Sequence, residues 1–235
     1  MKERRHPQDP DEELLAAELP SVASEISDQQ RVERMREELA YGFDALHGTG
    51  RAVAVFGSAR TDEGHPTYAL ARRVGHALGD AGFTVVTGGG PGAMEAANRG
   101  ARDAGARSIG LTIDLPTVEP PNPYLDLRLE FHYFFARKVM FVRYSGAFVV
   151  LPGGFGTMDE LFEALTLIQT GKIREFPVVL LGTEYWCGLV DWLRDRMLAD
   201  GNISPEDVDI LRVTDSIDEA VDICRHAHHR QWGEE

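Results

Sequence analysis

The chain has 235 residues, enough to bury a full hydrophobic core, and 43% of them are hydrophobic, as in an ordinary globular protein. Its formal net charge of −14 argues against a nucleic-acid polymer or an anionic membrane as partner, although a local cradle could still bind one phosphate group. The two cysteines, Cys187 and Cys224, suggest neither a disulfide framework nor a metal cluster. No apolar run approaches the ~20 residues of a membrane span and no signal peptide is visible, so we expect a cytoplasmic protein.

The N-terminal part of the chain divides into two patterns. Residues 1–26 are polar, acidic and contain proline, which predicts a disordered arm. Leucines between residues 14 and 19 offer an alternative, a short docking helix. In residues 27–46 apolar residues recur at three- and four-residue steps, which predicts an amphipathic helix that ends at Gly48. We expect residues 27–235 to form one domain with this helix added at its N-terminus.

The rest of the chain alternates strand and helix patterns. Several strand patterns, such as residues 147–151 and 178–181, are near-continuous apolar runs, typical of strands that helices cover on both faces of a parallel sheet. The alternation predicts an α/β protein with a Rossmann-like, doubly wound, mainly parallel sheet of about seven strands. The expected strands are 52–56, 84–87, 108–113, 128–131, 147–151, 178–181 and 209–213. The expected helices are 67–80, 92–104, 134–144, 157–170, 186–199 and 217–230. The irregular insert at 115–123 follows a strand and is a candidate lid.

Three glycine-bearing turns, at residues 57–60, 88–95 and 152–160, follow predicted strands. In a parallel sheet, ligands bind at the carboxyl ends of the strands, and glycine lets the backbone approach a ligand closely. The third turn, Pro-Gly-Gly-Phe-Gly-Thr-Met-Asp-Glu, leads into a helix and leaves free N–H groups at its start, a geometry that binds phosphate. It predicts a phosphorylated sugar or nucleotide as ligand, although each turn alone could be a tight strand-to-helix connection.

Two nucleotide-binding motifs can be tested directly. The chain has no G-x-x-x-x-G-K-[ST] motif, which excludes a P-loop NTPase. Gly88-x-Gly90-x-x-Ala93 matches a relaxed dinucleotide fingerprint, and Asp114 falls where a ribose-binding acid would lie. A dinucleotide-dependent enzyme is therefore a second hypothesis, but it leaves the turn at 152–160 without a role.

Glu160 has two interpretations. It places a carboxylate in the first turn of the helix that follows the phosphate cradle, where it could act on a bound ligand. The residues from Thr157 to Glu160 also fit a capping box, in which the glutamate reaches back to the start of the helix. Spacing alone favours the cap, and the two roles can coexist.

Arg137 and Lys138 fall in the first turn of the predicted helix at 134–144. Cations there oppose the helix dipole, which is expected where they meet an anionic ligand. Solvated surface cations are an equal explanation from charge placement alone. The histidines at 132 and at 226–229 are explained as a strand end and a solvated tail, so no metal site is predicted.

Three segments together resemble the LONELY GUY (LOG) family of cytokinin riboside 5′-monophosphate phosphoribohydrolases, many of which carry the label "lysine decarboxylase". The resemblance rests on residues 88–95, 135–138 and 152–160 and extends from about residue 51 to 199. The added N-terminal helix resembles the longer bacterial branch. The family implies a homodimer or larger homo-oligomer and hydrolysis, without a cofactor, of the N-glycosidic bond of a nucleoside 5′-monophosphate. Cytokinin nucleotides or AMP would give free base and ribose 5-phosphate.

The same resemblance assigns roles to residues. The family's catalytic arginine and glutamate fall on Arg137 and Glu160. Breaking an N-glycoside builds positive charge on the ribose, which a carboxylate can stabilise, or it can activate the attacking water. Arg137 would assist the leaving base or orient the phosphate or ribose; the sequence does not decide between these. The implied substrate-binding residues are Ser58, Gly89, Gly90, Met94, Lys138, Gly153, Gly154, Gly156 and Thr157.

Two other functions are weighed against this one. A non-catalytic nucleotide-binding or sensor protein would use the same cradle. A pyridoxal-phosphate decarboxylase needs a lysine for a Schiff base. Of Lys2, Lys138 and Lys172, only Lys138 is plausibly placed, and it lies beside the family's arginine, so we do not expect this chemistry.

Overall fold

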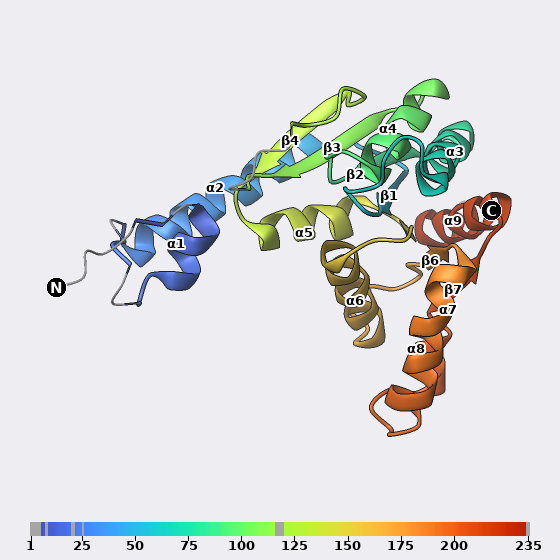
Figure 1. Ribbon diagram of the computed structural model, residues 1–235. Coiled ribbons are helices and arrows are strands. Elements are labelled where there is room, and N and C mark those ends of the chain that lie inside the picture. Colours follow the sequence, from blue (N-terminus) through green and yellow to red (C-terminus); the bar gives the residue numbers. More distant parts are fainter. Residues whose placement is uncertain (1–5, 8, 20–21, 25, 116–119, 234–235) are drawn as a thin grey trace.

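The computed structural model describes residues 6–7, 9–19, 22–24, 26–115 and 120–233, and these contain a seven-stranded sheet (Figure 1). Every pair of neighbouring strands is parallel, in the order β4-β3-β2-β1-β5-β6-β7. The chain moves outward from β1 to β4 and then crosses back to β5, so the order reverses between β1 and β5. This is the expected Rossmann-like, doubly wound sheet, and the reversal is where such sheets bind ligands. The strands are β1 (Ala52–Phe56), β2 (Thr84–Thr87), β3 (Ser108–Ile113), β4 (Leu127–Phe131), β5 (Phe148–Val150), β6 (Val178–Leu181) and β7 (Leu211–Thr214).

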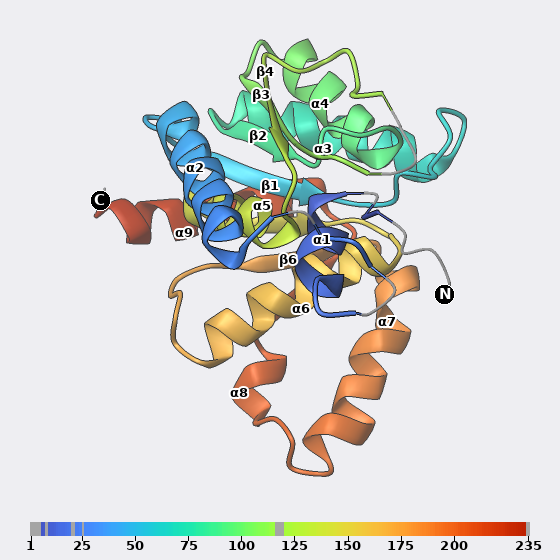
Figure 2. The ribbon, with the colours of Figure 1, turned by 90° about the vertical axis from the view of Figure 1, so that its left-hand side faces the viewer.

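Helices cover both faces of the sheet and bury a core on each (Figures 1 and 2). α3, α4 and α9 pack on one face, and α2, α5, α6 and α7 pack on the other. Within the described residues, every helix is too short or too polar to span a bilayer. The helices are α1 (Pro10–Ala16), α2 (Asp28–Leu46), α3 (Pro66–Asp80), α4 (Ala93–Asp103), α5 (Phe134–Tyr144), α6 (Phe155–Gln169), α7 (Thr183–Trp192), the π-helical η1 (Leu193–Leu198), α8 (Pro205–Val208) and α9 (Ile217–Trp232).

The central strand shows why its apolar run is continuous. All five residues of β1 are buried, and successive side chains enter opposite cores. Val53 and Val55 join the core under α3 and α4, whereas Phe56 joins the other one. There the Phe56 ring packs edge-on against Phe141 of α5 and Phe148 of β5, with ring centroids 4.9 and 4.8 Å apart. The strand that ends at the ligand-binding edge is therefore fixed from both sides.

Helices α3 and α4 approach each other closely enough for their backbones to touch. A Cβ atom on Gly75 would lie 2.0 Å from the carbonyl oxygen of Ala97, and one on Gly100 would lie 1.9 Å from that of Arg72. Side-chain carbons cannot approach so closely, so both positions require glycine. The two helices that follow β1 and β2 are thus packed without side chains between them at these points.

The expected strands and helices match the structure within about two residues, with three informative differences. Strand β7 begins at Leu211 rather than residue 209, because the short helix α8 occupies the residues before it and Asp209 is its C-cap. The helix expected at 186–199 begins earlier, at Thr183, and changes to π-helix after Trp192. Helix α6 begins two residues earlier than expected, which changes the interpretation of its first turn.

The segment expected to be a disordered arm contains a helix. The Asp9 side chain accepts a hydrogen bond from the amide of Glu12, and Pro10 occupies the first helical position, which together start α1. Leu14 packs against the core under α5, and Val22 is buried. The described residues thus match the docking-helix alternative. Outside the described residues lie positions 1–5, 8, 20–21 and 25 of the expected arm and positions 116–119 of the candidate lid. The division of the chain at residue 26 stays a prediction.

Candidate active site

The three glycine-bearing turns meet at the carboxyl edge of the sheet. The amide of Ser58, after β1, donates a hydrogen bond to the carbonyl of Pro152, after β5, at 3.2 Å. The carbonyl of Ser58 accepts one from the amide of Ala93, at the start of α4, at 3.0 Å. Ser58 therefore joins the turns that follow β1, β2 and β5. Their meeting point is the position between β1 and β5 where the strand order reverses.

The turn after β5 forms an open helix start. Gly154 is the N-cap of α6, and no side chain caps this end of the helix within the described residues. The first-turn amide hydrogens are consequently left for a ligand, as in phosphate-binding helix termini. A Cβ atom on Gly153 would lie 2.1 Å from Oγ1 of Thr157, so the threonine side chain packs directly against this glycine. Gly156 lies within the first turn itself.

The capping box considered for Thr157 and Glu160 is wrong. Because α6 begins at Phe155, Thr157 is the third helical residue rather than the N-cap. Its side chain packs on Gly153 instead of capping the helix. Glu160 therefore lies in the second turn of α6, and its carboxylate is available for another role.

Glu160 is a buried carboxylate next to a buried cation. The residue is 3% exposed, and one of its oxygens, Oε1, lies 4.0 Å from an Arg137 nitrogen. Burial raises the pKa of Glu160 to about 7, although the charges of Lys138 and Arg137 lower it. Near neutral pH this group can therefore exist with or without its proton, as a general base or acid requires.

Arg137 lacks a full set of hydrogen-bond acceptors. Its guanidinium lies over the rings of Phe134 and Phe141, at 5.3 and 5.7 Å from their centroids. Within the described residues, its buried Nε atom has no hydrogen-bond partner. Burial lowers the pKa of Arg137, while the nearby charges of Glu160 and Asp159 raise it. A buried guanidinium with an unused donor is suited to bind an anion that enters the site.

Lys138 faces helix α6 and connects it to α5. Its ammonium group lies 2.8 Å from a carboxylate oxygen of Asp159 and 2.7 Å from one of Glu163. Burial disfavours its charge, but these two contacts outweigh burial and raise the pKa of Lys138. The lysine thus balances the negative charge around Glu160, a role the sequence alone did not indicate.

A buried polar network fixes the glycine turn after β2. Gly89 has a φ of 71°, and its amide donates to Thr87 Oγ1 at 2.9 Å. Thr87 in turn donates to Asn98 Oδ1 at 2.6 Å. Asn122 donates its backbone amide to the carbonyl of Gly89 at 2.9 Å and its side-chain amide to that of Gly90 at 3.1 Å. The polar residues of this network were missed from the sequence, although asparagine in a helix face that packs on a sheet is a signal for one.

Two further contacts complete the edge of the site. Met94 lies against the glycine turn, since a Cβ atom on Gly88 would be 2.7 Å from its Sδ atom. Tyr185 of α7 donates its hydroxyl to the carbonyl of Gly153 at 2.6 Å, which fixes the peptide that precedes the N-cap of α6. Tyr185 also was not found from the sequence, because nothing in its spacing relates it to the turn.

Asp114, the ribose-binding candidate of the dinucleotide hypothesis, has acidic neighbours. Asp114 follows β3, as the dinucleotide hypothesis expects, but it borders a hollow that is also lined by Asp9, Asp11 and Glu12. This concentration of carboxylates is unfavourable for a phosphorylated cofactor. Among the described residues, no group of histidine, cysteine, aspartate or glutamate side chains is arranged to hold a metal ion.

The sequence of the chain has counterparts among known proteins. Residues 94–224, which include Arg137, Glu160 and the turn after β5, match the sequence model of a family described as "possible lysine decarboxylase". A Mycobacterium tuberculosis cytokinin riboside 5′-monophosphate phosphoribohydrolase is 34% identical over 166 residues, which are 68% of this chain and 88% of that protein. An Escherichia coli pyrimidine/purine nucleotide 5′-monophosphate nucleosidase is 36% identical over 125 residues, 49% of this chain but only 28% of the longer enzyme.

Solved structures support the same architecture. The X-ray structure of a protein called TM1055 superimposes with a TM-score of 0.56 and 25% identity, covering 75% of this chain and 99% of that one. The molybdenum cofactor carrier protein of Chlamydomonas reinhardtii has the same TM-score at 22% identity, covering 75% of this chain and 97% of its own, and shows a shared fold.

Proposed function

The chain belongs to the family described as "possible lysine decarboxylase", the LONELY GUY family that its motifs resemble, and from this premise we propose that it hydrolyses the N-glycosidic bond of nucleoside 5′-monophosphates. The products are a free base and ribose 5-phosphate. The observation that carries the proposal is the position of Glu160 in the second turn of α6, six residues from the uncapped N-cap Gly154. Six residues advance about 9 Å along the helix axis, so a phosphate at the start of α6 leaves the attached ribose within reach of this carboxylate.

The proposed mechanism uses the charges of two buried residues. As the bond between C1′ and the base breaks, positive charge develops on the ribose. The Glu160 carboxylate stabilises this charge or takes a proton from the water that adds to C1′, and its pKa of about 7 suits a base near neutral pH. Arg137, 4.0 Å from Glu160, stabilises the negative charge of the departing base or holds the phosphate or ribose. As proposed, these steps use the two side chains, the substrate and water.

We propose a substrate range that includes AMP and cytokinin nucleotides. The M. tuberculosis relative is named for cytokinin riboside 5′-monophosphates and the E. coli relative for pyrimidine and purine nucleotides. Ser58, Gly89, Gly90 and Met94 border the site from the β1 and β2 side and would contact the nucleotide there. The cytoplasmic location stays a prediction.

Decarboxylation through a Schiff base is not part of the proposal, despite the description of the family. The ammonium group of Lys138 contacts two carboxylates, which raise its pKa and keep it protonated. A Schiff base requires a neutral amine. Lys138 is thus held in the wrong state for that chemistry.

A second copy of the chain is proposed to cover the outer face of α6. Phe155 is 96% exposed at the start of this helix, and Phe162 is 36% exposed two turns further on. Both line a hollow of about 600 Å³ together with Met158 and Leu167. Large apolar side chains gathered on one face are typical of subunit contacts. Native mass spectrometry should therefore give a dimer or larger homo-oligomer, and a monomer at micromolar concentration would contradict it.

The test of the proposed function is release of free base. Purified protein is incubated with AMP or with isopentenyl-AMP, and base and ribose 5-phosphate are separated by chromatography. Wild-type protein should release both products, whereas Glu160→Gln should lose ~10²–10⁴ of the rate and still bind AMP. The same substitution at the exposed Glu206 is the control. Tight AMP binding without base release would support a sensor instead, and binding of NAD but not AMP would support the dinucleotide hypothesis.

A further inference from the structure

The amino end of α5, the helix that carries Arg137, is held by two carboxylates from the N-terminal part of the chain. Glu38 of α2 accepts hydrogen bonds from the backbone amides of His132 and Tyr133, at 3.0 and 2.9 Å. Its second oxygen lies 3.0 Å from Nδ1 of His132. Asp11 of α1 accepts the next amide, that of Phe134, at 3.3 Å. Three successive amides at this helix start are therefore paired with acids that lie about 95 to 125 residues earlier in the chain.

Two of these amides belong to Tyr133 and Phe134, which hold the backbone and the side chain of Arg137 in place. The amide of Arg137 donates to the carbonyl of Tyr133 at 3.2 Å, the first hydrogen bond of the helix at this point. The ring of Phe134 lies against the guanidinium, 5.3 Å from its carbon. A displacement of the strand-to-helix turn would consequently move both the backbone and the side-chain support of the arginine.

The two carboxylates also offset an unfavourable charge arrangement. Arg137 and Lys138 lie close to the amino end of α5, where the helix dipole opposes positive charge. Glu38 is only 8% exposed, so its negative charge acts on the helix end with little screening by water, whereas Asp11 is partly exposed and acts on it more weakly. No residue of α5 or of its own turn caps this end within the described residues. The N-terminal acids thus supply what the helix lacks.

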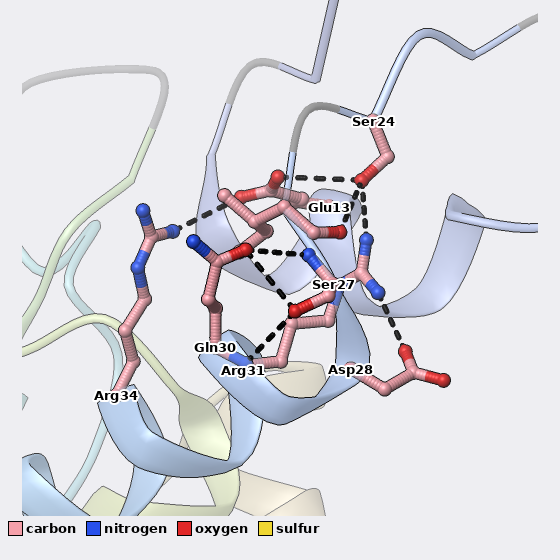
Figure 3. Close-up of polar contacts among 8 residues, drawn as sticks. Glu13, Ser24, Ser27, Asp28, Gln30, Arg31 and Arg34 are labelled. Atoms are coloured by element: carbon pink, nitrogen blue, oxygen red, sulfur yellow. Dashed lines mark hydrogen bonds and ion pairs between the residues drawn. The ribbon is translucent and has the colours of Figure 1, made fainter.

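The two helices that carry these carboxylates are joined by a polar network between α1 and α2 (Figure 3). Arg34 of α2 donates to Glu13 of α1 at 3.2 Å, and Ser24 donates to the same carboxylate at 3.5 Å. Arg31 of α2 donates to Ser24 and, at 2.6 Å, to Asp28. Ser24 is in this way tied to both helices, and α1 lies against α2 beside the amino end of α5 (Figures 1 and 2).

We propose that helices α1 and α2 act as a clamp that positions Arg137 for the reaction, with Asp11 and Glu38 as the positioning residues. This inference rests on the proposed function, because it assigns these acids a part in base release. Neither acid touches the substrate. Each acts by fixing the turn from which α5 starts and by balancing the charge that the arginine places there.

The variants separate the effect of the hydrogen bonds on turnover from the effects of charge and of general stability. Asp11→Ala removes the acceptor at a partly exposed contact on the outermost helix, whereas Asp11→Asn keeps an acceptor oxygen. Glu38→Met and Glu38→Gln make the same comparison at the buried site. Glu37→Gln, an exposed neighbour on α2, is the matched control. For each variant, kcat and KM for AMP are measured, together with hydrogen exchange at the amides of residues 132–134 and the melting temperature.

The clamp predicts a selective loss of turnover. In Asp11→Ala, kcat should fall about five- to tenfold with KM changed less than about twofold, exchange at Phe134 should accelerate, and Asp11→Asn should restore most of both. In a Glu38→Met protein whose melting temperature shows that it is folded, kcat should fall more than about tenfold. In Glu38→Gln, kcat should fall less.

Three outcomes would overturn the clamp. Faster exchange at Phe134 with an unchanged kcat would show that the contact does not position Arg137. Unchanged exchange in Asp11→Ala would show that the contact is not formed in solution. An equal loss in Glu37→Gln would show a general effect of charge. A wild-type protein that releases no base overturns the proposed function and is recognised before any variant is compared.

Discussion

Replacing Glu160 by glutamine should stabilise the folded protein above neutral pH while it removes most of the activity. The Glu160 carboxyl group would have a pKa near 4.5 in the unfolded chain, and burial raises it to about 7 in the folded one. That difference corresponds to about 3 kcal/mol of unfavourable free energy for holding the charged group in the folded state. Glutamine has nearly the same shape and never acquires the charge.

The gain in stability should depend on pH in one direction only. Below pH 4.5 the wild-type carboxyl is protonated in both states, and its contribution to stability is fully present. This contribution is lost as pH rises through the folded pKa of about 7, and above that pH the whole penalty applies. The advantage of Glu160→Gln should therefore grow from about 1 kcal/mol at pH ~5.5 to about 3 kcal/mol at pH ~8.5.

Urea unfolding followed by tryptophan fluorescence measures this difference. Wild type, Glu160→Gln and Glu206→Gln are compared at the two pH values, both above the isoelectric point of about 5.0. The exposed Glu206 substitution should change the free energy of unfolding little at either pH. A Glu160→Gln protein that is no more stable than wild type at the higher pH would refute the reasoning, as would a gain of equal size at both.

The remaining predictions concern the cradle, the arginine and the thiols. Gly153→Ala should raise KM for AMP at least ~10-fold, because the added carbon would lie 2.1 Å from Oγ1 of Thr157. The added carbon of Gly154→Ala meets nothing within 4 Å, so this variant should raise KM less. A larger rise in KM for Gly154→Ala than for Gly153→Ala would contradict the packing. Arg137→Lys should lower kcat ~10²-fold, because an ammonium group cannot replace the planar guanidinium between two rings, and a wild-type kcat would remove Arg137 from the mechanism. Iodoacetamide should label the exposed Cys187 and spare Cys224 in the folded protein, because burial raises the pKa of Cys224 to about 12. Mass spectrometry of peptides from native and denatured samples measures the labelling. Labelling of Cys224 in the native sample would contradict the prediction.

The strands were predictable from the sequence because their burial on both faces leaves a continuous apolar signal. Residues 178–181 illustrate this, since all four are buried and the predicted bounds equal the observed ones. The N-terminal helix was harder, because α1 has only 7 residues, begins with acidic side chains and depends on contacts such as that between Asp11 and Phe134. A short polar helix that is held by distant parts of the chain has the composition of a disordered arm.

The motifs located the candidate site but not its internal contacts. The three turns were identified from glycine and from their positions after strands, and their meeting at Ser58 follows from the parallel sheet. That Lys138 contacts substrate stays a prediction; its ion pairs with Asp159 and Glu163 on the facing helix α6 were not predicted. Helix periodicity does not determine which helix lies opposite, so contacts of this kind required the structure.

The contact between α3 and α4 has a consequence for how the site could open. Gly75 and Gly100 let the two backbones touch, and these helices follow the turns after β1 and β2. The two helices are therefore locked together at these points, and we expect the turns that precede them to move together. A motion that admits a nucleotide or releases a product would then come from the opposite wall, where α5 and α6 meet through Arg137, Lys138 and Glu160. We expect the residues that are proposed to carry out the reaction to set the rate of product departure as well.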